Sequence, residues 1–139
     1  MKTGVAAYPI SVNYSRGSNV MDYNSSQISV AVSLARTSDL VFIVVGDNSA
    51  GYGEGTCGEG IDRDDLDVPG GALPLIKAVL DAVEGNRTPV VVILIHGRAA
   101  TFGAGALSSV GSNNALLSRI PALLAAWRPG QLGGVCIRT

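Results

Sequence analysis

The sequence predicts an α/β domain built on a mostly parallel sheet, because strongly apolar runs alternate with segments of helical periodicity. Residues 40–45 (LVFIVV) and 89–95 (PVVVILI) are apolar throughout and rich in β-branched side chains, which is typical of strands covered on both faces. Segments 25–35 and 73–83 instead place apolar residues three and four positions apart. This alternation favours a three-layer α/β/α sandwich with helices on both faces of the sheet.

The amino-terminal elements follow from local pattern. Residues 10–14 (ISVNY) alternate apolar and polar side chains and predict a short strand, and turn-forming residues follow at 16–19. The next segment predicts a helix with Asn24 or Ser25 as its N-cap. Its apolar stripe consists of Ile28, Ala31, Val32 and Ala35.

A second helix is expected between the two buried strands, with a stripe of Leu73, Ile76, Leu80 and Val83. Pro74 suits its first turn, where a backbone N–H has no helical partner anyway, and Gly85-Asn86 suits its end. Residues 97–114 are rich in Gly, Ala, Ser and Asn and predict a loop with at most a short helix. Residues 121–127 (PALLAAW) fit either a strand or a helix.

Length and composition limit the classes of protein to which the chain can belong. With 139 residues, 47% hydrophobic and 15% charged, we expect one folded domain over residues 1–139, cut short at its carboxyl end. A net charge of -1 and scattered arginines argue against nucleic acid as a partner. Cys57 and Cys136 form no CxxC arrangement, which disfavours a zinc site or a disulfide framework.

The sequence does not assign the protein to a cellular compartment. No apolar run reaches the roughly 18 residues of a membrane span, and the amino-terminal residues lack the apolar core of a signal peptide. Three Asn-x-Ser/Thr sequons, at Asn13, Asn24 and Asn86, are compatible with a secreted or extracellular parent protein, but such a short pattern is weak. We therefore predict no membrane partner and leave the localisation unassigned.

The chemistry is expected in the long loop of residues 46–71, GDNSAGYGEGTCGEGIDRDDLDVPGG. Loops of this length in compact domains commonly carry function. This one contains Glu54 and Glu59, each between two glycines, and an acidic run after them. It begins where the strand 40–45 ends, and His96-Gly97-Arg98 leaves the neighbouring strand at the same edge, which is where ligands bind in parallel sheets.

Two ligand classes fit this loop poorly. Gly53-x-Gly55-x-x-Gly58 matches the dinucleotide fingerprint only formally, because several residues separate it from the strand and no helix follows it. The acidic residues 62–67 lack the glycine and the spaced glutamate of a calcium loop. We predict neither cofactor nor metal. A glutamate covered by a neighbouring domain could act as a general acid, whereas a solvated acidic turn is the alternative.

Four segments together resemble the carboxyl-terminal α/β-sandwich domain of glycoside hydrolase family 3: DLVFIVVGD, GEGIDRDDLDVPGG, TPVVVILIHGRAATF and IPALLAAWRPGQLGG. The similarity spans residues 12–134. It implies a flavodoxin-like fold and an exo-acting, retaining β-glycosidase, such as a β-glucosidase or β-xylosidase, with a β-linked glycoside as substrate. It also implies an amino-terminal (β/α) barrel domain that carries the aspartate nucleophile and is missing here, so the isolated chain is expected to be inactive.

The resemblance also assigns residue roles. Glu59 matches the general acid/base position because it is the last glutamate before the pair Asp62-Arg63, and Glu54 is the rival. Asp62 and Arg63 are expected to pin the loop by an ion pair, and Arg98 to support it. Residues that bind the sugar remain unknown.

His96 is expected to be a hydrogen-bonded scaffold residue. Trp127 is expected in the core, with stacking on a sugar ring as the alternative.

Two other functions remain possible from the sequence. A domain of this fold could bind a carbohydrate or a partner protein without catalysis. A nucleotide-binding flavodoxin-like domain is the weaker option. Binding of sugars or nucleotides by the isolated chain would distinguish these from the glycosidase.

Overall fold

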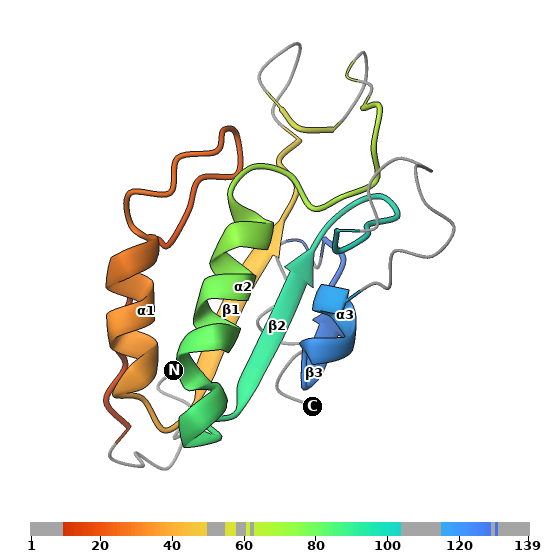
Figure 1. The fold of residues 1–139 in the computed structure, drawn as a ribbon. Coiled ribbons are helices and arrows are strands. Elements are labelled where there is room, and N and C mark those ends of the chain that lie inside the picture. Colours follow the sequence, from red (N-terminus) through yellow and green to blue (C-terminus); the bar gives the residue numbers. More distant parts are fainter. Residues whose placement is uncertain are drawn as a thin grey trace, which may run out of the picture.

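A computed structural model describes residues 10–49, 55–57, 61, 63–103, 115–128 and 130. Its centre is a parallel sheet of three strands in the order β1-β2-β3 (Figure 1). The strands are β1 (Val41–Gly46), β2 (Val90–Ile95) and β3 (Ala122–Ala125). The helices are α1 (Ile28–Arg36), α2 (Ala72–Val83), the 3₁₀ helix η1 (Glu84–Asn86) and α3 (Ala115–Arg119).

The strand register follows the chain order. Val41 lies opposite Val90 and Gly46 opposite Ile95, so β1 and β2 end together. Strand β3 joins the other edge of β2, with Val91 opposite Ala122. Helix α2 connects β1 to β2, and α3 precedes β3. The predicted α/β class with a parallel sheet is confirmed.

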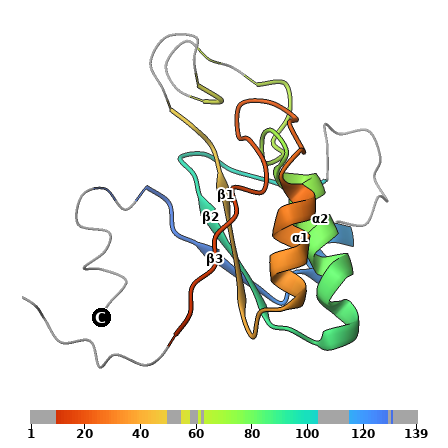
Figure 2. The ribbon, with the colours of Figure 1, turned by 90° about the vertical axis from the view of Figure 1, so that its left-hand side faces the viewer.

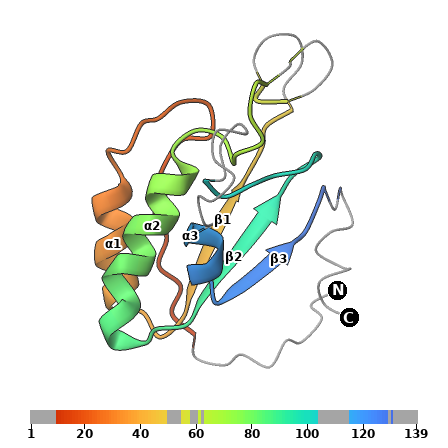
Figure 3. The ribbon, with the colours of Figure 1, turned by 45° about the vertical axis from the view of Figure 1, so that its right-hand side comes forward.

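The described helices lie on one side of the sheet (Figures 2 and 3). They cover the face formed by every second strand residue, including Ile43 and Val92, which are buried. On the other face, Phe42 and Val44 are each 58% exposed. The expectation that β1 is covered on both faces is therefore wrong for the part of the chain that the structure describes.

The core lies between the sheet and α2, as the helical stripe predicts. Ile76 and Val79 of α2 are fully buried and belong to the same cluster as Val90 and Val92 of β2. Burial of apolar surface at this interface is the main term that stabilises the domain.

Several local predictions are wrong. Residues 10–14 form no strand, and Ile10, Val12 and Tyr14 are exposed, because alternation alone supplies no sheet edge to pair with. Helix α1 begins later than expected, with Gln27 in the cap position. Asn24 instead accepts a hydrogen bond from the Ser26 N–H at 3.0 Å, closing a turn just before the helix.

The end of α2 also differs in detail. The helix ends at Val83 and tightens into η1, and Arg87 rather than Gly85 or Asn86 adopts the left-handed conformation, with φ 56°. The ambiguous segment 121–127 contains strand β3. Among the described residues, no helix is long and apolar enough to span a bilayer.

Candidate functional site

The carboxyl ends of the three strands bring three loops to one edge of the sheet. Asp47 follows β1, His96 follows β2, and Ala126 follows β3. The Asp47 N–H donates to the Ile95 carbonyl at 3.1 Å, and the Ala126 N–H donates to the Leu94 carbonyl at 2.9 Å. The strand ends are thus tied to each other beyond the sheet. The sequence predicts two of these loops as a site, and the structure adds the third.

An ion pair between Asp47 and Arg128 joins the first loop to the third. The Asp47 side chain is 3% exposed, and its Oδ1 accepts a hydrogen bond from Arg128 Nη2. Its Oδ2 accepts a hydrogen bond from the Gly97 N–H at 3.1 Å, so Asp47 also binds the loop that follows β2. A buried carboxylate needs such partners because desolvation strongly disfavours its charge.

The loop after β1 is closed by a neck at Asn48 and Thr56. The Asn48 carbonyl accepts from the Thr56 N–H at 2.8 Å and from the Cys57 N–H at 3.2 Å, and the Asn48 N–H donates to Thr56 Oγ1 at 2.8 Å. Thr56 is buried. In sequence Glu54 lies inside this neck and Glu59 just beyond it. Glu54, Glu59 and Asp62 fall outside the described residues.

Arg128 reaches both sides of the neck. Its Nη1 donates to Ser49 Oγ at 2.7 Å, and its Nη2 donates to the Cys57 sulfur at 3.2 Å. Burial raises the pKa of the Cys57 thiol, and a hydrogen bond to Asp47 and the charge of that carboxylate raise it further. The positive charges of Arg128 and Arg98 act in the opposite direction.

The loop continues into a second anchored stretch. Arg63 forms an ion pair with Asp65 at 2.8 Å and donates to the Asp67 carbonyl at 3.4 Å. The Arg63 hydrogen bond is the main cause that lowers the pKa of Asp65, and a hydrogen bond from the Asp67 N–H adds to it. The described partner of Arg63 is thus Asp65; a pairing with Asp62 stays a prediction.

The loop after β2 holds this stretch from the other side. Arg98 Nη1 donates to the Asp65 carbonyl at 3.3 Å. Asp67 Oδ1 accepts from Thr101 Oγ1 at 2.5 Å and from the Gly103 N–H at 2.9 Å, and Asp67 forms a parallel bridge with Thr101. Arg98 thus contacts the stretch that follows the neck, and its role as a loop support stays a prediction.

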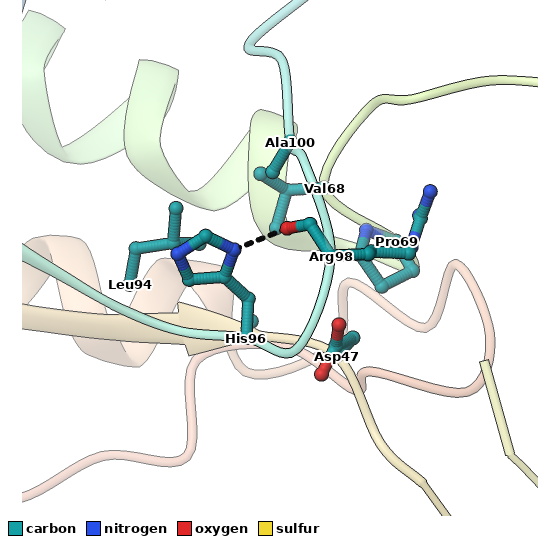
Figure 4. Close-up of a pocket in the computed structure, with 8 residues that line it drawn as sticks. Asp47, Val68, Pro69, Leu94, His96, Arg98 and Ala100 are labelled. Carbon is teal, nitrogen blue, oxygen red and sulfur yellow. Dashed lines mark hydrogen bonds between the residues drawn. The ribbon is translucent and has the colours of Figure 1, made fainter. Parts of the chain in front are cut away.

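His96 and Trp127 form a stacked pair between the ends of β2 and β3. The ring centroids are 4.5 Å apart and the planes are inclined by 18°. His96 is buried, and its Nδ1–H donates to the Arg98 carbonyl (Figure 4). Trp127 is 58% exposed, so its assignment to the core is wrong: it lies past the end of β3, where only one face of the indole is covered.

The enclosed space at this edge is small. A cavity of about 10 Å³ lies among Asp47, His96, Arg98 and neighbouring apolar residues (Figure 4). Such a volume holds at most one water molecule and no sugar ring. No three acidic, histidine or cysteine side chains within the described ranges are grouped to bind a metal ion. In the described part of the chain, the edge therefore presents an anchored loop, while the walls of a saccharide pocket are not formed there.

Comparison with known proteins places this geometry in context. The family model described as "Glycosyl hydrolase family 3 C-terminal domain" matches residues 3–138. A β-xylosidase of Formosa agariphila is 31% identical over 125 residues, and the probable β-D-xylosidase 7 of Arabidopsis thaliana is 30% identical over 124 residues. These alignments cover 90% and 89% of the chain but only 14% of each relative.

A solved structure also matches most of this chain. The structure of a β-glucosidase involved in saponin metabolism from intestinal bacteria aligns with a TM-score of 0.62 and 25% identity. The alignment covers 90% of this chain and 19% of the solved one. The chain thus spans about a fifth or less of the length of each of these three proteins.

Proposed function

The chain belongs to the glycosyl hydrolase family 3 C-terminal domain family, and from this we propose that it is the carboxyl-terminal domain of an exo-acting, retaining β-glycosidase. The observation that carries the proposal is the anchored loop 46–71 at the carboxyl edge of the sheet. Residues on both sides of Glu59 are fixed there, Cys57 by Arg128 and Asp65 by Arg63 and Arg98. We treat residues 1–139 as one domain of a larger enzyme.

The proposed chemistry divides two carboxylates between two domains. A retaining glycosidase uses one carboxylate as nucleophile at the anomeric carbon and another as acid/base, about 5–5.5 Å apart. In our proposal Glu59 protonates the leaving-group oxygen and then takes a proton from the incoming water. The nucleophile comes from a (β/α) barrel domain outside this chain, which also supplies most of the sugar pocket. The small cavity at the described edge supports that division.

Glu59 is preferred to Glu54 because it is the last glutamate before the pair Asp62-Arg63, on which the family resemblance rests. It lies between Cys57 and Arg63, and both are held by hydrogen bonds to other parts of the edge. Anchors on both sides limit how far a catalytic group can move, which matters because misplacement by about 1 Å can cost about 100-fold in rate. Arg63 and Arg98 act as loop supports in this proposal, and Asp62 is proposed to assist them.

The names of the relatives suggest the substrate class. Exo-1,4-β-xylosidases of Aspergillus awamori and Aspergillus niger are among them, and the solved neighbour is a β-glucosidase. We propose that the substrate is a β-linked xyloside or glucoside cleaved from the non-reducing end.

The test is made in the full-length protein that contains this chain, with aryl β-xylosides and β-glucosides of differing leaving-group acidity. Glu59→Gln should lower kcat strongly for poor leaving groups and little for activated ones, because only poor leaving groups need protonation. Glu54→Gln is the matched control, and it should change kcat little for either type of leaving group. The isolated chain should not hydrolyse either substrate. A uniform loss with both substrate types in Glu59→Gln, or selective loss in Glu54→Gln, would overturn the assignment.

A second candidate is a carbohydrate-binding domain without catalysis, and the exposed face of Trp127 favours it. Aromatic side chains stack on the apolar faces of sugar rings, and this indole is open to solvent at the edge. Calorimetry of the isolated chain with xylose, glucose and short β-linked oligomers tests this. Sugar binding by the isolated chain that is lost in Trp127→Ala would support a binding domain. If the isolated chain binds none of these sugars, the binding domain is ruled out in favour of the glycosidase.

A further inference from the structure

We propose that Arg128 is a positioning residue, whose guanidinium fixes the acid/base loop to the end of β3; the inference rests on the function proposed for that loop. One guanidinium contacts three loop residues. It pairs with the carboxylate of Asp47 and donates to Ser49 Oγ at 2.7 Å and to the Cys57 sulfur at 3.2 Å. Asp47 and Ser49 begin the loop, and Cys57 stands two positions before Glu59.

The contacts of Arg128 lie on both sides of the neck formed by Asn48 and Thr56. The backbone hydrogen bonds of the neck join Asn48 to Thr56 and Cys57, but none of them sets the orientation of the neck relative to the sheet. Arg128 supplies this orientation, because its planar fork of donors fixes direction as well as distance. A lysine would retain the charge but could not donate in the same fork geometry.

The surroundings of Arg128 hold the guanidinium in place. Asp47 is 3% exposed and accepts from both Arg128 and the Gly97 N–H, so the carboxylate is itself fixed. A side chain at residue 97 would bring its Cβ to 2.7 Å from Arg128 Nε, and glycine leaves this path open. Trp127, the preceding residue, is stacked on His96. Arg128 thus projects from a fixed point onto a fixed acceptor.

The function that follows is to set the position of the residues that precede Glu59. Arg63 and Arg98 hold the stretch that follows Glu59, through Asp65 and Asp67. Arg128 is the described counterpart on the other side. It touches no reacting atom in this scheme and acts only through the loop.

The first test measures hydrogen exchange in the 139-residue chain, at the Thr56 and Cys57 amides that donate to the Asn48 carbonyl. Arg128→Ala should speed exchange at both amides by about tenfold or more, because local opening controls their protection. Arg128→Lys should lie between this variant and the wild type. Arg119→Ala is the matched control: Arg119 is also ion-paired and is exposed to a similar extent, 34% against 38%, but it contacts Asp81 and Glu84 instead.

Removal of Arg128 leaves Asp47 buried without its partner, so Arg128→Ala could fail to fold. The double variant Asp47→Asn/Arg128→Ala removes both charges and keeps an acceptor for the Gly97 N–H. Faster exchange of the two amides in either variant, with the exchange in α2 unchanged, supports the proposal. Wild-type protection in a folded variant overturns it.

The second test separates this inference from the proposed function. In the full-length protein, Arg128→Ala should lower kcat for poor leaving groups by up to about 100-fold with little change in KM, and Arg128→Lys should restore part of it. If Arg128→Ala has a normal kcat while Glu59→Gln shows the selective loss, the role of Arg128 is overturned and the proposed function stands. If Glu59→Gln has no selective effect, the proposed function fails, and the exchange data still report whether Arg128 holds the loop.

Discussion

The indole ring of Trp127 stacks on the imidazole of His96, with centroids 4.5 Å apart, and so joins the exits of β3 and β2. Trp127 has a left-handed backbone, with φ 54°, which is uncommon for a residue with a bulky side chain. The stacking contact offsets part of the cost of this conformation. The backbone direction at residue 127 also determines where Arg128 projects.

Removal of the imidazole should therefore change the environment of the indole. His96→Ala opens the second face of Trp127 to water, so the fluorescence emission should shift to longer wavelength. Trp127 is the single tryptophan of the sequence, so the signal is unambiguous. We expect a stability loss of at least about 0.5–1.5 kcal/mol, the range for an aromatic pair. An unchanged emission spectrum would contradict the stacked geometry.

Gly97→Ala should disturb the loop without removing any of its hydrogen-bonding groups. The new methyl group would stand 2.7 Å from Arg128 Nε, so the pinned arginine must move. We expect faster exchange at the Thr56 and Cys57 amides. Gly85→Ala is the control, because its Cβ would meet no atom within 4 Å. Equal exchange in both variants would show that the contact with Gly97 does not matter.

The two faces of β1 should respond differently to truncation. Ile43 is 4% exposed against the helices, and Ile43→Ala should cost about 2–5 kcal/mol in the free energy of unfolding. Val44 is on the open face, and Val44→Ala should cost less than about 1 kcal/mol. Urea denaturation of the two variants checks this. A large loss for Val44→Ala would mean that some other segment covers that face.

The Arg63–Asp65 pair should make stability depend on pH in the acid range. The pKa of Asp65 is lowered from its ordinary value of 3.8, chiefly by the hydrogen bond from Arg63. The folded state therefore keeps this carboxylate ionised at a lower pH than the unfolded chain does. Its contribution is present above the ordinary value and is lost as the pH falls through the lowered value.

Asp65→Asn should thus flatten the fall in unfolding free energy below about pH 4, the range in which an unperturbed aspartate titrates. The exposed neighbour Asp64 provides the control variant, Asp64→Asn. Chemical denaturation at a series of pH values measures both. A slope that persists in Asp65→Asn would assign the acid sensitivity to other groups.

The elements with continuous apolar patterns could be predicted from the sequence. Residues 40–45 and 89–95 coincide with β1 and β2 to within one residue, because runs of β-branched side chains have few alternatives to a buried strand. The edge that holds the site follows from parallel topology alone. The prediction of a strand at residues 10–14 is wrong because strand formation depends on a partner strand, which a local pattern does not reveal.

The contacts that hold the loop in place could not be predicted from the sequence. Arg128 pairs with Asp47 across 81 positions, and although each residue lies in a segment that carries the family resemblance, neither segment shows that the two residues pair. In the sequence the arginines are scattered and give no sign that one of them is bound to a buried carboxylate. Trp127 follows an apolar run, which favours the core, but the end of β3 leaves it at the edge.

The link between Arg128 and Asp47 has a consequence for loop exchange between related enzymes. A transplant of residues 46–71 into another scaffold would bring Asp47, Ser49 and Cys57 but leave their shared donor behind. The recipient would then bury an uncompensated carboxylate. A minimal transferable unit therefore consists of two pieces of chain, the loop itself and the turn that contains Arg128.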